Sequence, residues 1–438
     1  MKHIGLAIFL LLSPLSIAAP RVLVIGDSMS EEYSFEIPFS APENDPLDAN
    51  TQNWIESLDA HRSGQIDFGS YASNIAAYPD VRNGGYKYNW SIPGADTDQW
   101  QDVVTSTFFN QPGFLTSRWE LEDQLNDDNI DVVVIFIGGN DVRAIYGSLY
   151  NNAPPSDWIS DITDNLKEVI DFIQGENSSL PIILCTIPDV GATPKKQETS
   201  TDPALRQIAA GHMQTLNTAV VQLATSEGAI LADIAKLTSD ILKDEDYYIG
   251  GTLMIKGADP NNAPHYLFCR DGFHPATAAQ AVIANTILEQ INIATSSTID
   301  PIEDRDIISD LLFLNPDQPY LEWIASFPIS ANDMLEDPDG DGLPNIGEYA
   351  LGTSPDSANS PYSMELTSID GTPHFLMTYP VSEQGIRLVS IINEHSSNLT
   401  HWDELPAASN VDLGNGDFQI QDPAATFHFY RQSFQLKP

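Results

Sequence analysis

The chain has 438 residues, of which 42% are hydrophobic, enough for a sizeable packed core and, at roughly 150 residues per domain, for about three domains. It carries 62 acidic and 19 basic side chains, a formal net charge of −43. Like charges repel, so this balance excludes nucleic acid and anionic membrane surfaces as expected partners.

The first 18 residues are typical of a secretory signal peptide. Lys2 provides the positive charge, residues 4–12 form an apolar run too short to span a bilayer, and Ser16 and Ala18 fit a cleavage site. We therefore expect export, with cleavage after Ala18. Export permits a disulfide, and the sequence leaves open whether Cys185 and Cys269 form one or stay free and buried.

Strand and helix patterns alternate between residues 20 and 295. This alternation predicts an α/β domain whose parallel sheet is covered by helices on both faces. The connection 31–85 is long, and we expect it to wall the substrate cleft with Tyr33, Phe35 and Phe39. Strands are predicted at 21–25, 86–91, 131–137, 180–187 and 229–233, and helices at 53–61, 157–173, 205–224 and 276–291.

Three short segments place reactive side chains at the ends of these elements. Ser28 follows the first strand, and Asn140 follows the strand at 131–137. Ligands of open parallel sheets bind beyond the carboxyl ends of the strands, so both should reach one site. Asp271 and His274 precede the last helix, and their spacing predicts one helical or 3₁₀-like turn that holds both side chains on the same side.

These segments together resemble the SGNH hydrolases, also called GDSL esterases and lipases. The matching blocks are Gly-Asp-Ser-Met at 26–29, Gly-Gly-Asn-Asp at 138–141 and Asp-Gly-Phe-His-Pro at 271–275, and 89–95 resembles a further, softer block. The resemblance covers about residues 20–295. It implies a flavodoxin-like three-layer α/β/α domain.

The resemblance also implies roles for individual residues. Ser28, Asp271 and His274 would form the catalytic triad, with no cofactor for catalysis. The backbone N–H groups of Ser28 and Gly94 and the side-chain amide of Asn140 would form the oxyanion hole. We expect hydrolysis of carboxylic esters through an acyl-enzyme.

The sequence leaves several classes of substrate open. Deacetylation of a polysaccharide and cleavage of short-chain esters are the favoured interpretations, and a lipase, phospholipase or thioesterase is the alternative. The alternative from a different functional class is a non-catalytic carbohydrate-binding adhesin built on the same scaffold.

Residues 337–348 match the twelve-residue EF-hand loop. Carboxylates stand at positions 1, 3 and 5, Gly342 at position 6 and a glutamate at position 12. An all-oxygen ligand set favours Ca²⁺, and the segment resembles the isolated calcium motifs of dockerin-like and thrombospondin type 3-like repeats. We expect a structural Ca²⁺ held by Asp337, Asp339, Asp341, the Leu343 carbonyl, Asn345 and Glu348.

The remaining sequence divides into short units. After the signal peptide (1–18) and the hydrolase domain (20–295), we expect an acidic linker (296–320), the calcium-binding segment (321–358) with helices at 320–326 and 346–351, and a small all-β module (361–438). The expected role of Ca²⁺ is to stiffen the joint between the hydrolase domain and this module. Oligomeric state is not indicated.

Overall fold

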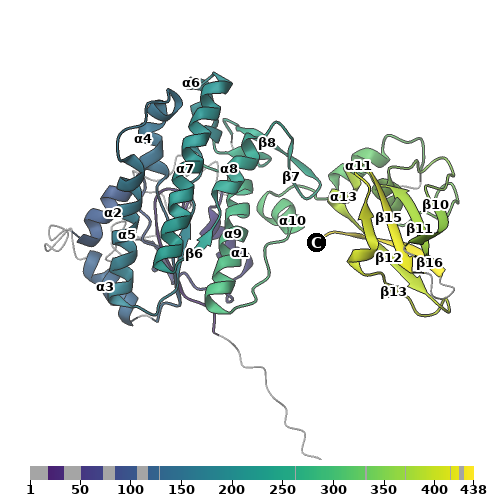
Figure 1. Cartoon of the computed structure of the whole chain (residues 1–438), viewed down its shortest axis with the longest axis horizontal. Helices are drawn as coiled ribbons and strands as arrows, with labels where there is room; N and C mark the ends of the chain where they lie inside the picture. The colour runs from purple at the N-terminus through teal and green to yellow at the C-terminus, as the bar shows by residue number, and fades with distance from the viewer. Residues whose placement is uncertain are drawn as a thin grey trace, which may run out of the picture.

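The computed structural model describes residues 18–33, 51–72, 84–105, 117–127, 129–261, 263–330, 333–369, 371–414, 416–423 and 429–438. The expected signal peptide lies almost wholly outside the described residues, as do Phe35 and Phe39. The described chain forms an α/β lobe followed by a smaller β-rich lobe (Figure 1). None of its helices is long and apolar enough to cross a membrane.

A parallel sheet of buried valines and isoleucines forms the centre of the α/β lobe. Its strand order is β1-β4-β5-β6, and the segment around Tyr88 runs beside the free edge of β1, where the Val24 N–H donates to the Tyr88 carbonyl. That arrangement is the flavodoxin-like order that the family resemblance implied. The strands are β1 (Val22–Gly26), β4 (Val132–Phe136), β5 (Ile182–Cys185) and β6 (Ile230–Ala232).

Successive residues of each strand contribute to opposite faces of the sheet, so the lobe has two separate cores. Val22 and Val24 face one helical layer, while Leu23 and Ile25 face the other. The first layer contains α1 (Trp54–His61), α8 (Ala235–Leu242) and α9 (Thr277–Thr295). The second contains α2 (Thr97–Thr105), α3 (Ser117–Asp127), α4 (Gly139–Tyr150), α5 (Trp158–Glu176) and α7 (Pro203–Glu227).

Smaller elements complete this lobe around its loops. They are β2 (Tyr71–Ala72), β3 (Gly85–Tyr86), the 3₁₀ helix Val190–Ala192, α6 (Pro194–Thr199), and the small sheet of β7 (Tyr247–Ile249), β8 (Thr252–Ala258) and β9 (Tyr266–Phe268). Cys185 and Cys269 are both buried and free, so no bridge joins them.

The segment expected to be an acidic linker packs largely against the α/β lobe. Its apolar residues join the core beneath α9, and α9 amides from Asn285 and Asn292 donate to the carbonyls of Ile302 and Ile299. The segment includes α10 (Asp304–Asp306) and the π-helix Ile307–Leu311. These contacts could not be predicted from composition, because the isoleucines of the segment are interspersed with exposed acidic residues.

Two antiparallel sheets form the C-terminal lobe. Their orders are β10-β11-β15-β14 and β13-β12-β16, and short helices pack against them. The strands are β10 (Ser363–Ile369), β11 (Thr372–Pro380), β12 (Val389–Ser396), β13 (Asp403–Glu404), β14 (Asn410–Asp412), β15 (Asp417–Pro423) and β16 (Phe429–Leu436). The helices are α11 (Gln318–Ile324), α12 (Asn345–Leu351), α13 (Gly385–Leu388) and the 3₁₀ turn Ala407–Ser409.

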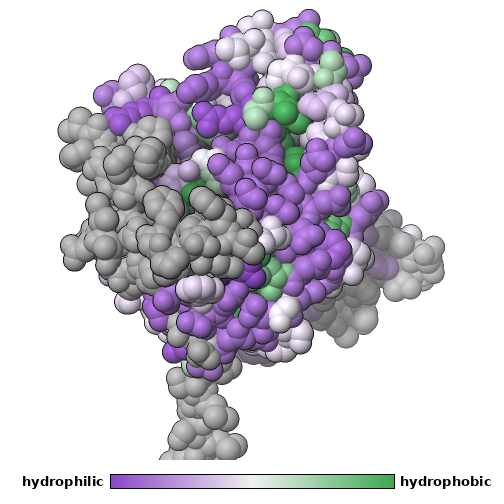
Figure 2. Space-filling view, turned by 90° about the vertical axis from the view of Figure 1, so that its left-hand side faces the viewer, coloured by the Kyte–Doolittle hydropathy of each residue, from purple (hydrophilic) through white to green (hydrophobic). Residues whose placement is uncertain are grey.

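The two lobes meet through α13 and the small sheet of the α/β lobe. The Arg387 guanidinium lies 3.8 Å from the centre of the Tyr248 ring, and a side chain at Gly251 would touch Leu388 and Pro319. Figure 2 looks onto the α/β lobe from its far end and shows a mostly hydrophilic surface with small, separate hydrophobic patches. That surface agrees with the strongly acidic composition.

Candidate active site

The loop after β1 presents Ser28 at the carboxyl edge of the sheet. Gly26 permits this because a Cβ there would lie 2.8 Å from the Ser91 hydroxyl and 3.1 Å from the Phe136 carbonyl. Asp27 then turns the chain, and its side chain accepts from the Met29 N–H at 2.8 Å. The serine that follows is 8% exposed, so its hydroxyl lies in a sheltered position at the rim.

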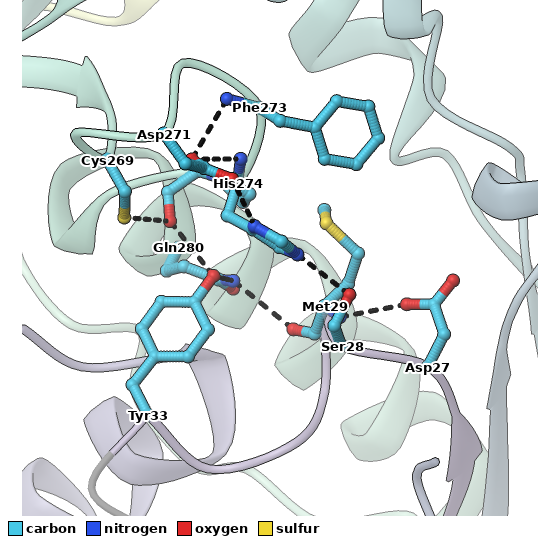
Figure 3. A network of polar contacts seen from close by, with 10 residues as sticks. Asp27, Ser28, Met29, Tyr33, Cys269, Asp271, Phe273, His274 and Gln280 are labelled. Carbon is cyan, nitrogen blue, oxygen red and sulfur yellow. Dashed lines mark hydrogen bonds and ion pairs between the residues drawn. The ribbon is translucent and has the colours of Figure 1, made fainter. Parts of the chain in front are cut away.

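Ser28, His274 and Asp271 are joined by two short hydrogen bonds. The Ser28 Oγ lies 2.8 Å from Nε2 of His274, and Nδ1 of the same ring lies 2.7 Å from Oδ2 of Asp271 (Figure 3). The serine is 246 residues from the histidine in sequence, so the fold itself brings them together. This order of hydroxyl, imidazole and carboxylate is the arrangement in which a base activates a nucleophile and a third group orients the base.

The loop that carries Asp271 and His274 differs from the helical turn expected from the sequence. Gly272 has φ of +69°, a left-handed conformation that interrupts a helix and favours glycine. The Asp271 side chain instead closes the loop by accepting from the N–H groups of Phe273 and His274. The Cys269 N–H donates to the His274 carbonyl and fixes the loop to β9.

Asp271 is held as a carboxylate by its surroundings. Burial alone would raise its pKa, but the hydrogen bond and charge of His274, together with the backbone N–H groups of Phe273 and His274, bring the pKa below its usual value. An ionised Asp271 keeps the proton of the neutral imidazole on Nδ1, which leaves Nε2 free to accept from Ser28.

The expected oxyanion donors lie in two loops and at the start of α4. Within the described chain, the backbone N–H groups of Ser28 and Gly94 have no hydrogen-bond acceptor. Asn140 is the second residue of α4, but its amide nitrogen is already engaged, at 2.9 Å from the Ala95 carbonyl and 3.4 Å from Oδ2 of Asp27. The second of these distances is at the long end of the hydrogen-bond range, so that interaction is the weaker of the two.

Gly138 sets the start of α4 and therefore the position of Asn140. Its φ is +114°, and a Cβ there would lie 2.5 Å from Cδ1 of Ile187. Only glycine fits both restrictions. The positive end of the α4 dipole consequently points toward the edge of the sheet that carries Ser28, which suits developing negative charge.

Comparison with known proteins gives one decisive match. The sequence model of the GDSL-like lipase/acylhydrolase family matches residues 22–287, more than half of the chain. The chain belongs to this family. It is an ester hydrolase. No curated protein matches the sequence.

Solved structures similar to this GDSL-like acylhydrolase share little sequence with it. An acetylxylan esterase from Geobacillus stearothermophilus is 20% identical, with a TM-score of 0.34, over 63% of this chain and 94% of that one. A carbohydrate esterase of family 3 from Talaromyces cellulolyticus is 15% identical, with a TM-score of 0.33, over 64% and 100%. A phospholipase A1 from Streptomyces albidoflavus is 16% identical, with a TM-score of 0.33, over 62% and 99%.

Two buried aspartates brace the loops of the acylhydrolase site. Burial raises the pKa of Asp27 to about 7, although the Met29 N–H and the charge of His274 act in the opposite direction. Asp141 accepts from both the backbone N–H and the hydroxyl of Thr97, which ties α4 to the start of α2. These contacts give both residues structural functions around the donors of the site.

A buried polar network that the sequence analysis missed joins the serine loop to the histidine loop (Figure 3). The Gln280 amide, on α9, donates to the Met29 carbonyl at 3.2 Å and to the Tyr33 hydroxyl at 2.8 Å. The same hydroxyl donates to the Pro275 carbonyl at 3.0 Å. Tyr33 is 1% exposed, so the expectation that it walls the cleft is wrong. A glutamine on the apolar face of a predicted helix was the available signal.

An apolar hollow opens beside Ser28 in this acylhydrolase. It encloses about 620 Å³ between the protein atoms, part of it open to solvent, and Ser28 and Asn140 lie in its lining. Asp189, also in the lining, has its pKa raised to about 6 by burial. Most of the wall is hydrocarbon, contributed by Met29, Ile234, Leu237, Ile241, Phe268, Ala279 and Ile283.

Proposed function

We propose that the chain is an exported serine hydrolase that cleaves carboxylic esters through an acyl-enzyme on Ser28. The observation that carries the proposal is the pair of hydrogen bonds from Ser28 to His274 and from His274 to Asp271, at 2.8 and 2.7 Å. The expected signal peptide supports export. No cofactor is required for this chemistry, because the nucleophile, the base and the oxyanion donors are all side-chain or backbone groups.

The reaction follows from the positions of these groups. His274 Nε2 takes the hydroxyl proton while Ser28 Oγ forms a bond to the ester carbonyl carbon, and Asp271 stabilises the imidazolium. When the tetrahedral intermediate collapses, the bond to the alcohol oxygen breaks and His274 gives its proton to the departing alkoxide. Water then repeats the sequence on the acyl-enzyme, and the acid leaves.

The oxyanion role of Asn140 gives a testable expectation. Asn140→Ala should lower kcat by about 10²- to 10³-fold with KM little changed, because the amide binds the oxyanion more strongly than the ground-state carbonyl. Steady-state kinetics on p-nitrophenyl butyrate measures this. Asn151→Ala at the far end of α4 is the matched control. A loss in Asn140→Ala no larger than that of the control would remove Asn140 from the proposed site.

The shape of the hollow bears on the acyl group of the substrate. Acetyl would reach little of the apolar wall beside Ser28, whereas a longer acyl chain would cover Ile234, Leu237 and Ile241 and gain about 0.8 kcal/mol for each buried methylene. The hollow therefore supports esters with short to medium acyl chains. Deacetylation of a polysaccharide stays the second candidate and rests on the accessory C-terminal module.

A chain-length series separates these substrate classes. For p-nitrophenyl esters from acetate to octanoate, kcat/KM should rise by up to about 4-fold per methylene until the hollow is filled. Ala279→Leu places a larger side chain in the lining and narrows the hollow. It should remove most of the increase in kcat/KM with chain length, while kcat/KM for the acetate ester changes little. Ala204→Leu, on the exposed start of α7, is the matched control.

The outcomes of the series are distinct. A maximum at acetate, with faster acetate release from acetylated xylan or chitin, would favour polysaccharide deacetylation. Activity limited to long-chain emulsions or phospholipids would favour the lipase alternative. Failure to cleave any ester in the series would favour the non-catalytic adhesin and overturn the proposed function.

A further inference from the structure

The C-terminal lobe contains an acidic cluster that the esterase site does not use. Asp337, Asp339 and Asp341 each offer a carboxylate oxygen, and these oxygens lie within 4.8 Å of one another. The loop curls around the cluster through Gly340 and Gly342, whose N–H groups both donate to Asp337. Three carboxylates held this close repel one another unless a cation lies between them.

A buried glutamate supplies independent evidence for a missing ligand. Glu348 on α12 is 0% exposed, its Oε2 atom is buried with no hydrogen-bond partner, and Oε1 has only the Thr353 hydroxyl at 3.3 Å. One buried carboxylate oxygen of Asp339 is likewise without a partner. No lysine or arginine among the described residues forms an ion pair with Glu348.

The electrostatics of Glu348 point to the same cluster. Glu348 lies near enough to Asp339 and Asp341 for their negative charges to act on its carboxylate. A buried, unpartnered carboxylate costs free energy, and native proteins generally offset that cost with a partner or a metal. A divalent cation between Glu348 and the three aspartates would satisfy the open oxygens and reverse the repulsion.

We propose that this cluster binds one Ca²⁺ ion through Asp337, Asp339, Asp341, the Leu343 carbonyl and Glu348, and that the ion holds together the two apolar cores of the C-terminal lobe. Oxygen ligands in a loop with several carboxylates suit Ca²⁺ better than zinc or the small, strictly octahedral Mg²⁺. Asn345, the other sequence-predicted ligand, donates to the Asp333 carbonyl and so anchors the start of α12.

The packing around the loop explains why the ion would be structural. Leu343 is part of the core formed by β11 and β15, with Met377, Tyr379 and Ile420. Only three residues later, Ile346 enters the second core, shared by α11, α12 and the start of β12. The loop therefore joins both cores, and its conformation determines how α12 lies between them.

The same packing revises the expected place of the ion. The sequence analysis put Ca²⁺ at the joint between the lobes, whereas α12 is buried inside the C-terminal lobe. Contact with the other lobe is made by the neighbouring helices α11 and α13, whose Pro319 and Leu388 lie against Gly251. Both helices pack on α12, and a Cβ at Gly385 of α13 would come within 2.2 Å of the Tyr349 carbonyl. Any influence of the ion on the joint would pass from α12 through α11 and α13.

Thermal unfolding of the full chain with Ca²⁺, with Mg²⁺ and with EDTA tests the proposal, together with calorimetric titration of Ca²⁺. We expect one Ca²⁺ per chain with Kd of about 10⁻³ M or below, and at 100-fold excess over Kd a rise of roughly 10 °C in the unfolding midpoint of the C-terminal lobe. Hydrolysis of p-nitrophenyl butyrate should be unchanged by EDTA at a temperature below either transition, so failure of this proposal is distinguishable from failure of the esterase proposal.

The Glu348→Gln variant should affect thermal stability differently in EDTA and in Ca²⁺. In EDTA it should be at least as stable as the wild type, since a repelled buried charge is removed, whereas the stabilisation by Ca²⁺ should be lost. Glu404→Gln on exposed β13 is the matched control. Asp339→Asn tests the same point if Glu348→Gln does not fold. Absence of Ca²⁺ binding to the wild type, or full Ca²⁺ stabilisation of both variants, would overturn the proposal.

Discussion

Replacement of Ser28 by alanine should abolish ester hydrolysis, with a loss in kcat on the order of 10⁶-fold. The reason is that Ser28 Oγ, which lies 2.8 Å from Nε2 of His274, is the atom proposed to form the acyl-enzyme. Steady-state assays on p-nitrophenyl butyrate measure the loss. A fluorophosphonate probe, which reacts with activated serines, should label the wild type and leave Ser28→Ala unlabelled.

The control for this experiment is a serine that bears no relation to the site. Ser239, exposed on α8, donates only to the carbonyl one turn earlier, so Ser239→Ala should keep full activity and labelling. The unfolding midpoints of both variants should lie close to that of the wild type. Retention of wild-type kcat by a folded Ser28→Ala protein would falsify the acyl-enzyme mechanism.

Asp271→Asn should lower kcat by about 10⁴-fold and leave the fold intact. An amide in place of the carboxylate can donate to Nδ1 of His274 and so move the ring proton to Nε2, the nitrogen that must accept from Ser28. It also removes the negative charge that stabilises the imidazolium. Ser28 should still react with a fluorophosphonate, but far more slowly, and the time course of labelling measures this difference.

Asp244→Asn, on an exposed loop, is the comparison for the loss of one negative charge. It should not change kcat or the rate of labelling. If Asp271→Asn kept kcat within 10-fold of the wild type, the carboxylate would only support the loop through the N–H groups of Phe273 and His274, and another group would have to orient the imidazole.

The central sheet and the places of Ser28 and Asn140 at its edge could be predicted from the sequence because both depend on local patterns. Runs of valine and isoleucine identified β1, β4 and β5, and the rule that sites lie at the carboxyl ends of parallel strands brought Ser28 and Asn140 to one edge. The resemblance to the family then supplied the roles. The hydrogen bond between Ser28 and His274, by contrast, is observed only in the structure.

Features that depend on tertiary packing could not be predicted in this way. Gln280 stands on the apolar face of the predicted helix, but its partners, the Met29 carbonyl and the Tyr33 hydroxyl, are distant in sequence. Tyr33 looks like a surface aromatic until α9 is packed beside it. The left-handed Gly272 replaced the expected helical turn because the Asp271 side chain satisfies the backbone N–H groups itself. The isoleucines of 296–320 were overlooked because acidic composition outweighed their spacing.

One glutamine on α9 supports both the loop that carries Ser28 and the loop that carries His274. Gln280 bonds to the Met29 carbonyl on one side and, through Tyr33, reaches Pro275 on the other. The contact between Ser28 and His274 is therefore formed when the polypeptide folds, before any ester arrives. Binding of an acyl group then requires little rearrangement of these two loops. The free energy gained by burying the acyl chain in the apolar hollow can therefore appear directly as selectivity among acyl chains.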